Sequence, residues 1–291
     1  MASGSTEKDT GRIMIDEIIF EIKKKKVLSS LPEEFVKSLI IDFFKKYPKL
    51  EKDLKKHPKL LKSRDFKFLL KEIRKKLHSI YGVFVLDEKG LKLLKSHLKK
   101  TKKIDDRALD IHRKILLTHK STAERFDNYS FVYEKIFSIT GKPDKILDLA
   151  CGLNPLSFPW MRLKKVFYYA SELTLEDSKF IQDYFDLMKK HSGLHGKAFA
   201  MNLLNFRKFP EADVCFLFKV LDSLEDLKKN YSKVLLEKIS AKFLVVSFPT
   251  MSLGDKKPIK ERGWFFRMMR ELDYSFESFE IENEIFYIVK K

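Results

Sequence analysis

The second half of the chain alternates short apolar runs with amphipathic stretches, and this alternation restricts its possible folds more than any other feature. Short apolar runs rich in branched and aromatic residues predict strands, and stretches with helical spacing between them predict helices. Strands joined through helices pair in parallel by right-handed crossovers. We therefore expect a mostly parallel sheet from residue 145 onward. The predicted strands are 145–150, 166–171, 198–201, 213–218, 242–248, 275–282 and 284–289, and the predicted helices are 154–163, 174–190, 222–238 and 260–272.

The last two predicted strands have no helix between them, which indicates an antiparallel hairpin at the end of the sheet. The first half instead shows apolar residues at helical spacing in PEEFVKSLIIDFF and RDFKFLLKEIRKKLHSI, and a third helix is expected over 88–99. The fold class predicted is α/β, a Rossmann-like, mostly parallel sheet preceded by an all-helical N-terminal domain. Its parts are a disordered leader at 1–11, a basic helical domain at 12–117 and the sheet domain at 118–291.

The net charge of +18 is concentrated in the first part of the chain. Residues 1–117 hold 31 lysines and arginines against 17 acidic residues, a balance of +14, and residues 118–291 hold 28 against 24, a balance of +4. A basic front half indicates a polyanionic partner. Solvated helix faces in a lysine-rich chain explain the same numbers equally well. If the partner is RNA, the residues expected to meet it are Lys23, Lys24, Lys25, Lys26, Lys67, Lys71, Arg74, Lys75, Lys76, Lys99 and Lys100.

Several classes of protein are disfavoured by composition. No apolar run is long enough for a transmembrane helix, and the polar N-terminus lacks the apolar segment of a secretory signal. The two cysteines, Cys151 and Cys215, lie in apolar surroundings, so we expect no disulfide and a cytoplasmic location. No Cys/His spacing suggests zinc, and no metal site is expected.

The stretch LDLACGLNPL, at 147–156, places a tight turn directly after a predicted strand. Open α/β sheets bind ligands at such turns, and Gly152 lets the backbone approach a ligand closely. A single glycine is too few for the pyrophosphate motif Gly-x-Gly-x-x-Gly, and no Walker sequence occurs. Glu172 ends the next strand, 24 residues after Asp148, where a carboxylate can accept hydrogen bonds from ribose hydroxyls. The combination fits S-adenosylmethionine, and a Rossmann-like fold with another ligand remains the alternative.

The residues 119–161, HKSTAERFDNYSFVYEKIFSITGKPDKILDLACGLNPLSFPWM, resemble the aminoglycoside-resistance 16S ribosomal RNA guanine-N7 methyltransferases. That family carries a His-x-Ser-Thr-x-Glu-Arg segment, a D-x-A-C-G-x-N-P-L turn and a Pro-Trp-Met. The blocks DVCFLFKVLDSLE, VVSFPTMSLG and EIENEIFYIVKK are similar to later blocks of the family, in the same order. The resemblance covers about 115–291. The front half is similar only in kind, as a basic helical domain that in the family docks on the small ribosomal subunit.

The resemblance implies methylation of N7 of guanine 1405 in 16S rRNA, within the 30S subunit, by a protein that we expect to be a monomer. It implies S-adenosylmethionine as cofactor, with His119, Arg125, Asp148, Ala150 and Gly152 around its methionine end. Glu172 is placed at the ribose, and the adenine lies between Asn202 and Leu203.

Three positions depart from the family pattern. Glu172 and Asn202 stand where aspartate is common, and Met251 stands where an arginine is expected after Ser-Phe-Pro-Thr. Glu172 is longer than aspartate but chemically alike. Met251 puts a contact with the target nucleotide in doubt.

The implied chemistry needs no catalytic acid or base. Guanine N7 has a lone pair and no proton, so the work of the enzyme is to hold N7, methyl and sulfur in line. The candidate contacts to a flipped target base are Lys219, Phe248 and Trp160. The plainer interpretations are that Lys219 is a solvated charge and that Phe248 and Trp160 are core residues. For His119 the plainer interpretation is a histidine at a helix end. Methylation of another RNA or of a small molecule, or a catalytically silent RNA-binding or ribosome-assembly factor, are the alternative functions.

Overall fold

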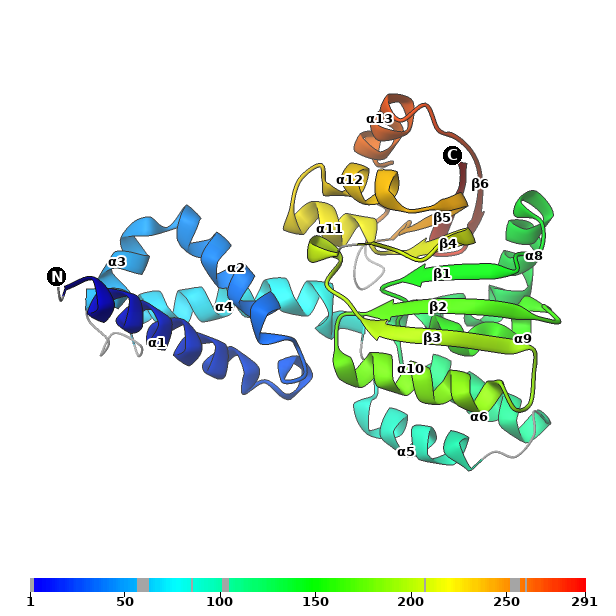
Figure 1. Ribbon diagram of the computed structural model, residues 1–291, viewed down its shortest axis with the longest axis horizontal. Helices are drawn as coiled ribbons and strands as arrows, with labels where there is room; N and C mark the ends of the chain where they lie inside the picture. Colours follow the sequence, from blue (N-terminus) through cyan, green and yellow to red (C-terminus); the bar gives the residue numbers. More distant parts are fainter. Residues whose placement is uncertain are drawn as a thin grey trace. The chain divides into compact units, whose positions relative to one another are not determined.

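The structure is a computed structural model. It describes residues 3–56, 63–84, 86–100, 105–206, 208–251, 257–259 and 261–291, without the side chains of residues 3–12, 88, 89 and 99. The chain forms two compact units, Met1–Val83 and Phe84–Lys291, and Figure 1 shows the helices of the first and the sheet of the second.

The first unit is helical, as the apolar spacing predicts. Its helix α2 buries one apolar stripe, Phe35 to Phe44, and Ser63 caps α4 by accepting a hydrogen bond from the Phe66 N–H at 3.1 Å. Helix α1 begins at Ser3, so it includes most of the segment that the sequence assigns to a leader. The described helices are α1 (Ser3–Lys23), α2 (Glu33–Lys46), α3 (Pro48–Lys56) and α4 (Arg64–Ile80), with 3-10 turns at Lys26–Leu28 and Gly82–Phe84.

Among the described residues of the second unit, four α-helices precede the sheet. Asp87 and Asp105 cap the first two of them, and Leu98, Ile115 and Leu116 are buried in the same apolar core as the sheet. The boundary by packing therefore falls at residue 83, whereas the sequence divides the chain at 117 on the basis of charge, which is a property of the surface. These helices are α5 (Glu88–Lys99), α6 (Asp106–Leu116), α7 (Lys120–Arg125) and α8 (Tyr129–Thr140).

The sheet has seven strands in the order β3-β2-β1-β4-β5-β7-β6. Strands β1 to β5 are parallel, and β7 runs antiparallel to both of its neighbours. This confirms the predicted mostly parallel sheet with an antiparallel closing pair; the last strand inserts between β5 and β6. The strands are β1 (Lys145–Leu149), β2 (Val166–Glu172), β3 (Leu194–Ala200), β4 (Ala212–Phe218), β5 (Ala241–Pro249), β6 (Ser275–Ile281) and β7 (Glu284–Lys290).

Two predicted helices are interrupted. The stretch 222–238 forms two helices because Asn230 adopts a left-handed conformation, with φ of 61°. The Glu225 carboxylate fixes this break by accepting from the N–H groups of Asn230, at 2.7 Å, and Ser232, at 2.8 Å. The stretch 154–163 forms a 3-10 turn and a short helix that ends at left-handed Arg162.

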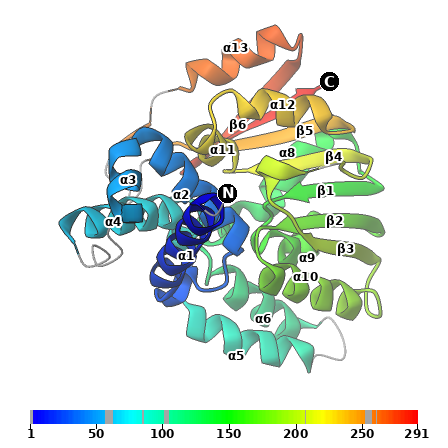
Figure 2. The same cartoon turned by 60° about the vertical axis from the view of Figure 1, so that its left-hand side comes forward.

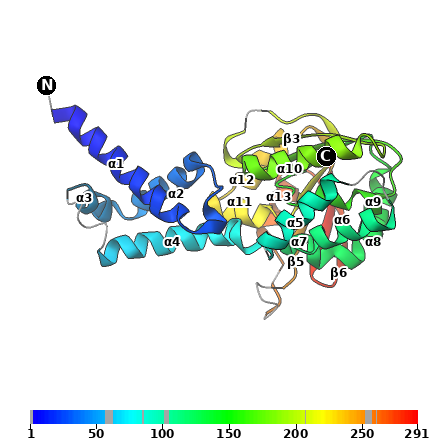
Figure 3. The same ribbon diagram turned by 90° about the horizontal axis from the view of Figure 1, so that it is seen from below.

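Helices cover the sheet unevenly. The remaining helices are α9 (Phe158–Met161), α10 (Leu175–Met188), α11 (Leu221–Leu227), α12 (Tyr231–Lys238) and α13 (Gly263–Glu271). The connection from β3 to β4 contains only the 3-10 turn Leu203–Asn205 among its described residues. Helix α10 packs against β3 and β2, and Figures 2 and 3 show it beside β3. None of the described helices is long and apolar enough to cross a membrane, and the described residues contain no group of side chains suited to a metal ion.

Candidate active site

The candidate site lies where the parallel strands end. The chain leaves β1 through Gly152, ends β2 at Glu172 and leaves β4 at Lys219. Because parallel strands have their carboxyl ends at one edge, these residues lie on the side of the sheet where α/β proteins bind ligands. The structure places Gly152 in contact with both His119 and Glu172, three residues that the resemblance assigns to a cofactor site.

The turn after β1 is held against β2 by its backbone. Ala150 and Gly152 both adopt left-handed conformations, with φ of 52° and 55°. Between these two residues, the Cys151 N–H donates to the carbonyl of Ser171 in β2 at 3.0 Å, and this hydrogen bond fixes the turn to the strand. Cys151 is buried, so its thiol serves as a small packing group.

Glu172 holds the same turn from the end of β2. One carboxylate oxygen accepts a hydrogen bond from the Gly152 N–H, and the other accepts from the Leu173 N–H at 3.2 Å. Each oxygen can accept a second hydrogen bond, which is the capacity that two ribose hydroxyls require. Burial, with a smaller effect of nearby Asp177, raises the pKa of Glu172 to about 8.

His119 packs directly on Gly152. A Cβ placed at Gly152 would lie 3.1 Å from His119 Cε1, so this glycine is required by its positive φ and by the imidazole. The ring also stacks on Phe84, with centroids 5.6 Å apart. Burial lowers the pKa of His119 to about 4, so the ring is neutral at physiological pH. Its buried Nδ1 has no hydrogen-bond partner in the part of the chain that the structure describes.

Arg125 is fully buried and bound on several sides. Its guanidinium makes a bidentate pair with Glu284, at 3.1 and 2.9 Å, and donates to Asn154 Oδ1 at 3.2 Å and to Ser121 Oγ at 3.0 Å. It also lies 4.6 Å from the centre of the Phe218 ring. Burial alone would lower the pKa of Arg125, but the Glu284 carboxylate outweighs it and raises that pKa. At the methionine end of a cofactor, Arg125 can therefore act only from within this network.

Glu284 joins Arg125 to Lys219. Its carboxylate lies 3.2 Å from Lys219 Nζ and accepts from the Ser247 hydroxyl at 2.5 Å. Lys219 Nζ also donates to Glu124 at 2.6 Å. Burial would raise the pKa of Glu284, but Arg125 and Lys219 lower it below its usual value. Glu284 was not predicted from the sequence, because it begins the apolar run EIFYIV directly after Glu282 and Asn283, where an acid looks like part of a turn.

Asp148, which the resemblance places around the methionine end of the cofactor, lies inside the protein beside the turn. It is buried, and its carboxylate accepts from Asn154 Nδ2 at 2.9 Å and from the Tyr168 hydroxyl at 2.6 Å. Burial raises the pKa of Asp148 to about 6. Asn154 Oδ1 in turn accepts a hydrogen bond from Arg125. Asp148 is therefore connected through Asn154 to the Arg125–Glu284 pair, and it supports the turn from inside the protein.

The two residues predicted to flank an adenine follow β3. The Asn202 side-chain oxygen accepts a hydrogen bond from the Leu204 N–H at 3.0 Å. An aspartate carboxylate can accept the same hydrogen bond, so asparagine can replace aspartate at this position. Leu203 is buried, and its carbonyl accepts from the Tyr231 hydroxyl at 2.9 Å. The Met201 N–H donates to the Glu172 carbonyl at 2.7 Å, so this segment is tied to the end of β2.

The three candidate target contacts are all engaged within the protein. Lys219 is neither solvated nor unpaired, because its ammonium lies between two carboxylates. Phe248 is fully buried, with its ring against Phe265 at 5.2 Å, so the plainer interpretation as a core residue fits it. Trp160 is half-buried and packs edge-to-face on Phe126 at 5.3 Å. Met251 forms an isolated β-bridge with Pro258.

Most of the predicted RNA-binding cations lie at the surface. Lys23 is half-buried and pairs with Glu33 at 3.6 Å, and the Arg74 guanidinium donates to the Glu21 carbonyl. Lys76 is also half-buried, and the side chain of Lys99 lies outside the described residues. The exposed members of the set are Lys24, Lys25, Lys26, Lys67, Lys71, Lys75 and Lys100.

The strand order, the glycine turn after β1 and the acid that ends β2 define a Rossmann-like methyltransferase of class I. Residues 62–288 match the family described as ribosomal RNA methyltransferase (FmrO), and the chain belongs to that family.

Named relatives agree with this assignment. A 16S rRNA (guanine(1405)-N(7))-methyltransferase of Micromonospora echinospora is 30% identical over 229 residues, which cover 76% of this chain and 82% of the relative. One of the same name from Proteus mirabilis is 27% identical over 241 residues, 77% of this chain and 85% of the relative. The fold is also that of the 16S rRNA methyltransferase RmtF, solved with S-adenosyl-L-homocysteine: the TM-score is 0.72 at 23% identity, over 95% of this chain and 98% of RmtF.

Proposed function

We propose that this protein transfers the methyl group of S-adenosylmethionine to N7 of guanine 1405 in 16S rRNA, within the 30S subunit of the cytoplasm. The observation that carries the proposal is the match to relatives of that name over about three quarters of the chain. Support from the geometry is the carboxylate of Glu172 beside a left-handed glycine turn at the carboxyl edge of the sheet. We expect the protein to act as a monomer.

The residues at this edge fit a nucleoside-bearing methyl donor. Glu172 has accepting capacity for two ribose hydroxyls, and the buried Nδ1 of His119 offers a polar atom near the turn. The segment at Asn202 and Leu203 would border the adenine. When bound, the cofactor supplies an electrophilic methyl group on a sulfonium. The tasks of the protein are to orient that methyl and to exclude water from the site.

The buried ions have a positioning role in this proposal. Guanine N7 attacks through its lone pair and releases no proton, so Asp148 and Glu172 need not act as bases. Arg125 and Lys219 are fixed by Glu284 beneath the ends of β1 and β4, where they set the electrostatic potential around the turn. Methyl transfer thus depends on a rigid edge, and we expect substitutions in the network to lower the rate through geometry.

Cofactor affinity should rise with pH. The pKa of Glu172 is raised to about 8 in the unliganded protein, and ribose hydroxyls bind the carboxylate better than the carboxylic acid. Below pH 8 the binding reaction must release this proton, so affinity should increase between pH 6 and 8 and level off above. Calorimetry in buffers of different ionisation enthalpy measures the proton released. Glu172→Gln should remove the pH dependence; an unchanged profile in that variant would contradict the assignment.

Binding to the 30S subunit should depend strongly on salt. If the cations of the first unit neutralise about four to six phosphates, log K should fall against log salt with a slope of roughly −3 to −5. Equilibrium binding of labelled 30S subunits from 50 to 200 mM salt measures this slope. Charge reversal at Lys67 and Lys71, both exposed, should make it shallower. A slope near zero in the unmodified protein would exclude phosphate contacts as the main source of affinity.

The test of the proposed function is methyl incorporation into purified ribosomal subunits. With tritiated S-adenosylmethionine, 30S subunits should become labelled in their RNA, whereas 50S subunits should not. A catalytically silent assembly factor would bind 30S without transferring label, and a methyltransferase for another RNA would label that RNA instead.

A further inference from the structure

One face of β2 and β3 presents aromatic and basic side chains to solvent. Residues that pair in adjacent parallel strands share a face, and the pairings are Lys145 with Phe167, Phe167 with His195, and Tyr169 with Lys197. We call these five residues the aromatic-basic face. Phe167 is 38% exposed, Lys145 and Lys197 are exposed, and the other two are half-buried.

The two faces of these strands differ in their cover. On the opposite face α10 packs so closely that a Cβ at Gly196 would lie 2.6 Å from the Phe185 ring. No described helix follows β3 to cover the aromatic-basic face, because the connection to β4 holds only the 3-10 turn Leu203–Asn205. Figures 1 and 2 show no helix of the second unit across the face of β2 and β3 opposite α10. An uncovered sheet face that carries aromatic rings marks an interaction surface.

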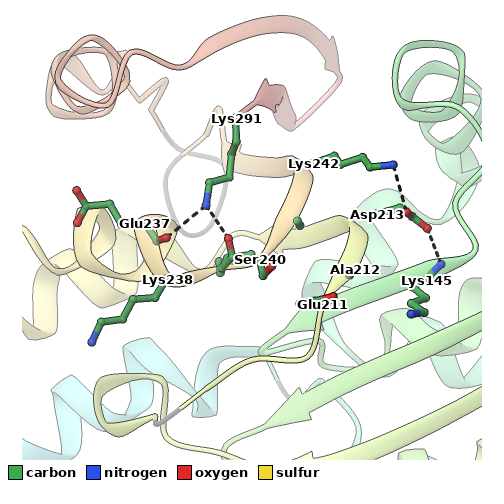
Figure 4. A pocket seen from close by; sticks show the side chains of 11 residues that line it. Lys145, Glu211, Ala212, Asp213, Glu237, Lys238, Ser240, Lys242 and Lys291 are labelled. Atoms are coloured by element: carbon green, nitrogen blue, oxygen red, sulfur yellow. Dashed lines mark hydrogen bonds and ion pairs between the residues drawn. The ribbon is translucent and has the colours of Figure 1, made fainter.

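The charges around the rings favour a polyanion. Lys145, Lys197 and His195 surround Phe167 and Tyr169. Asp213, Glu211 and Glu237 line a pocket with Lys145. Asp213 is already engaged: it accepts from the N–H groups of Asp144 and Lys145, each at 2.9 Å, and Lys242 Nζ lies 4.0 Å away. Figure 4 shows the Lys145 side chain extending away from the Asp213 carboxylate. The cations of the face are therefore available to phosphates.

We propose that the aromatic-basic face binds unpaired ribonucleotides, with bases stacked on Phe167 and Tyr169 and phosphates at Lys145 and Lys197. The ring centroids are 4.8 Å apart and the planes are tilted by 47°, so the pair offers a platform about two rings wide. Exposed aromatics interleaved with cations on a sheet are the arrangement by which proteins hold single-stranded RNA. The inference deepens the proposed function by adding a contact to the RNA substrate outside the cofactor edge.

The first test uses the full chain and a labelled 12-nucleotide oligouridine, with a 12-base-pair RNA duplex for comparison. Phe167→Ala should weaken binding of the single strand by roughly 5- to 100-fold, the range for loss of one stacked base, and should affect the duplex much less. Phe131→Ala is the matched control, because Phe131 is 44% exposed but lies on α8. Equal affinity of the single strand for both variants and the unmodified protein would overturn the proposal.

The second test uses charge. Lys145→Glu with Lys197→Glu should make the salt slope for the oligouridine shallower by about 1.4, since each phosphate contact on a single strand contributes about 0.7. Lys179→Glu with Lys189→Glu changes the net charge equally, on α10 and at its C-cap, and should leave the slope unchanged. If the first pair weakens 30S binding but not oligouridine binding, the face meets a ribosomal protein and the RNA proposal is wrong. Concentration-dependent dimerisation lost in the first pair would likewise refute it, in favour of a second copy of the chain.

Neither test uses methyl transfer. If the unmodified protein fails to methylate 30S subunits while Phe167→Ala lowers oligouridine affinity, the proposed function fails and this surface stands. If 30S subunits are methylated and all variants bind oligouridine alike, only this surface fails.

Discussion

Replacing Glu284 with glutamine should lower the free energy of unfolding by about 3–5 kcal/mol, the range for removing one partner of a buried ion pair. Glutamine is nearly isosteric, so the loss is electrostatic. Arg125 would keep its charge without its bidentate partner, and Lys219 would keep only Glu124. Urea unfolding monitored by circular dichroism measures the change in midpoint and in free energy.

The pH dependence of the free energy of unfolding provides a second test of this prediction. The pKa of Glu284 is depressed in the folded protein, so its contribution is present above its unfolded value of about 4.5 and is lost as pH falls below that value. The difference between Glu284→Gln and the unmodified protein should therefore shrink in acid. Glu271→Gln is the control, because its pair with Lys233, at 2.8 Å, lies at the surface and contributes little. Similar losses in both variants would show that the buried network does not stabilise the fold.

Replacing Gly152 with valine should weaken binding of S-adenosylmethionine by about 30- to 1000-fold. A branched residue at a φ of 55° is strained, and its Cβ would meet the His119 ring at 3.1 Å. The turn must then move, which shifts the N–H that holds the Glu172 carboxylate. Losing one or two hydrogen bonds to a charged group costs about 2–4 kcal/mol, which gives the stated factor. Isothermal titration calorimetry measures it.

The variant Gly141→Ala is the control that separates the effect of backbone strain from the effect of a change in the cofactor site. Gly141 also has a positive φ, of 73°, but nothing lies within 4 Å of its Cβ position, and it precedes β1 at the other end of the strand. This variant should lose some stability and keep its cofactor affinity. If folded Gly152→Val binds the cofactor as tightly as Gly141→Ala does, the cofactor does not lie at the turn.

The sheet was predictable because it depends on local patterns. Apolar runs fix strands, and the helices between them fix parallel pairing, so β1, β2, β4 and β5 begin and end within one or two residues of the predictions. Strand β3 begins four residues early, at Leu194, because His195, Gly196 and Lys197 interrupt its apolar pattern. The break at Asn230 depends on a Glu225 side chain, which no periodicity reveals.

Site residues could be predicted from the sequence where a residue type has a specific physical role, such as a glycine in a tight turn. A glycine turn after a strand and an acid at the end of the next were found, and the structure joins them by a hydrogen bond. Glu284 comes from the far end of the chain, 159 residues from Arg125, so only the folded sheet brings the two together. Phe248 shows the converse, because the sequence cannot tell a ring at a strand end that faces solvent from one in the core.

The most direct test of the central claim is to map the methylated atom. Methylation at N7 gives guanine a fixed positive charge, so borohydride followed by aniline should cut 16S RNA from treated 30S subunits at that base. We predict one strong cut, at guanine 1405, which depends on S-adenosylmethionine and is absent without the protein. A methyl group on an adenine N1 or a ribose hydroxyl would contradict the mechanism, and a cut at another guanine would contradict the assigned nucleotide.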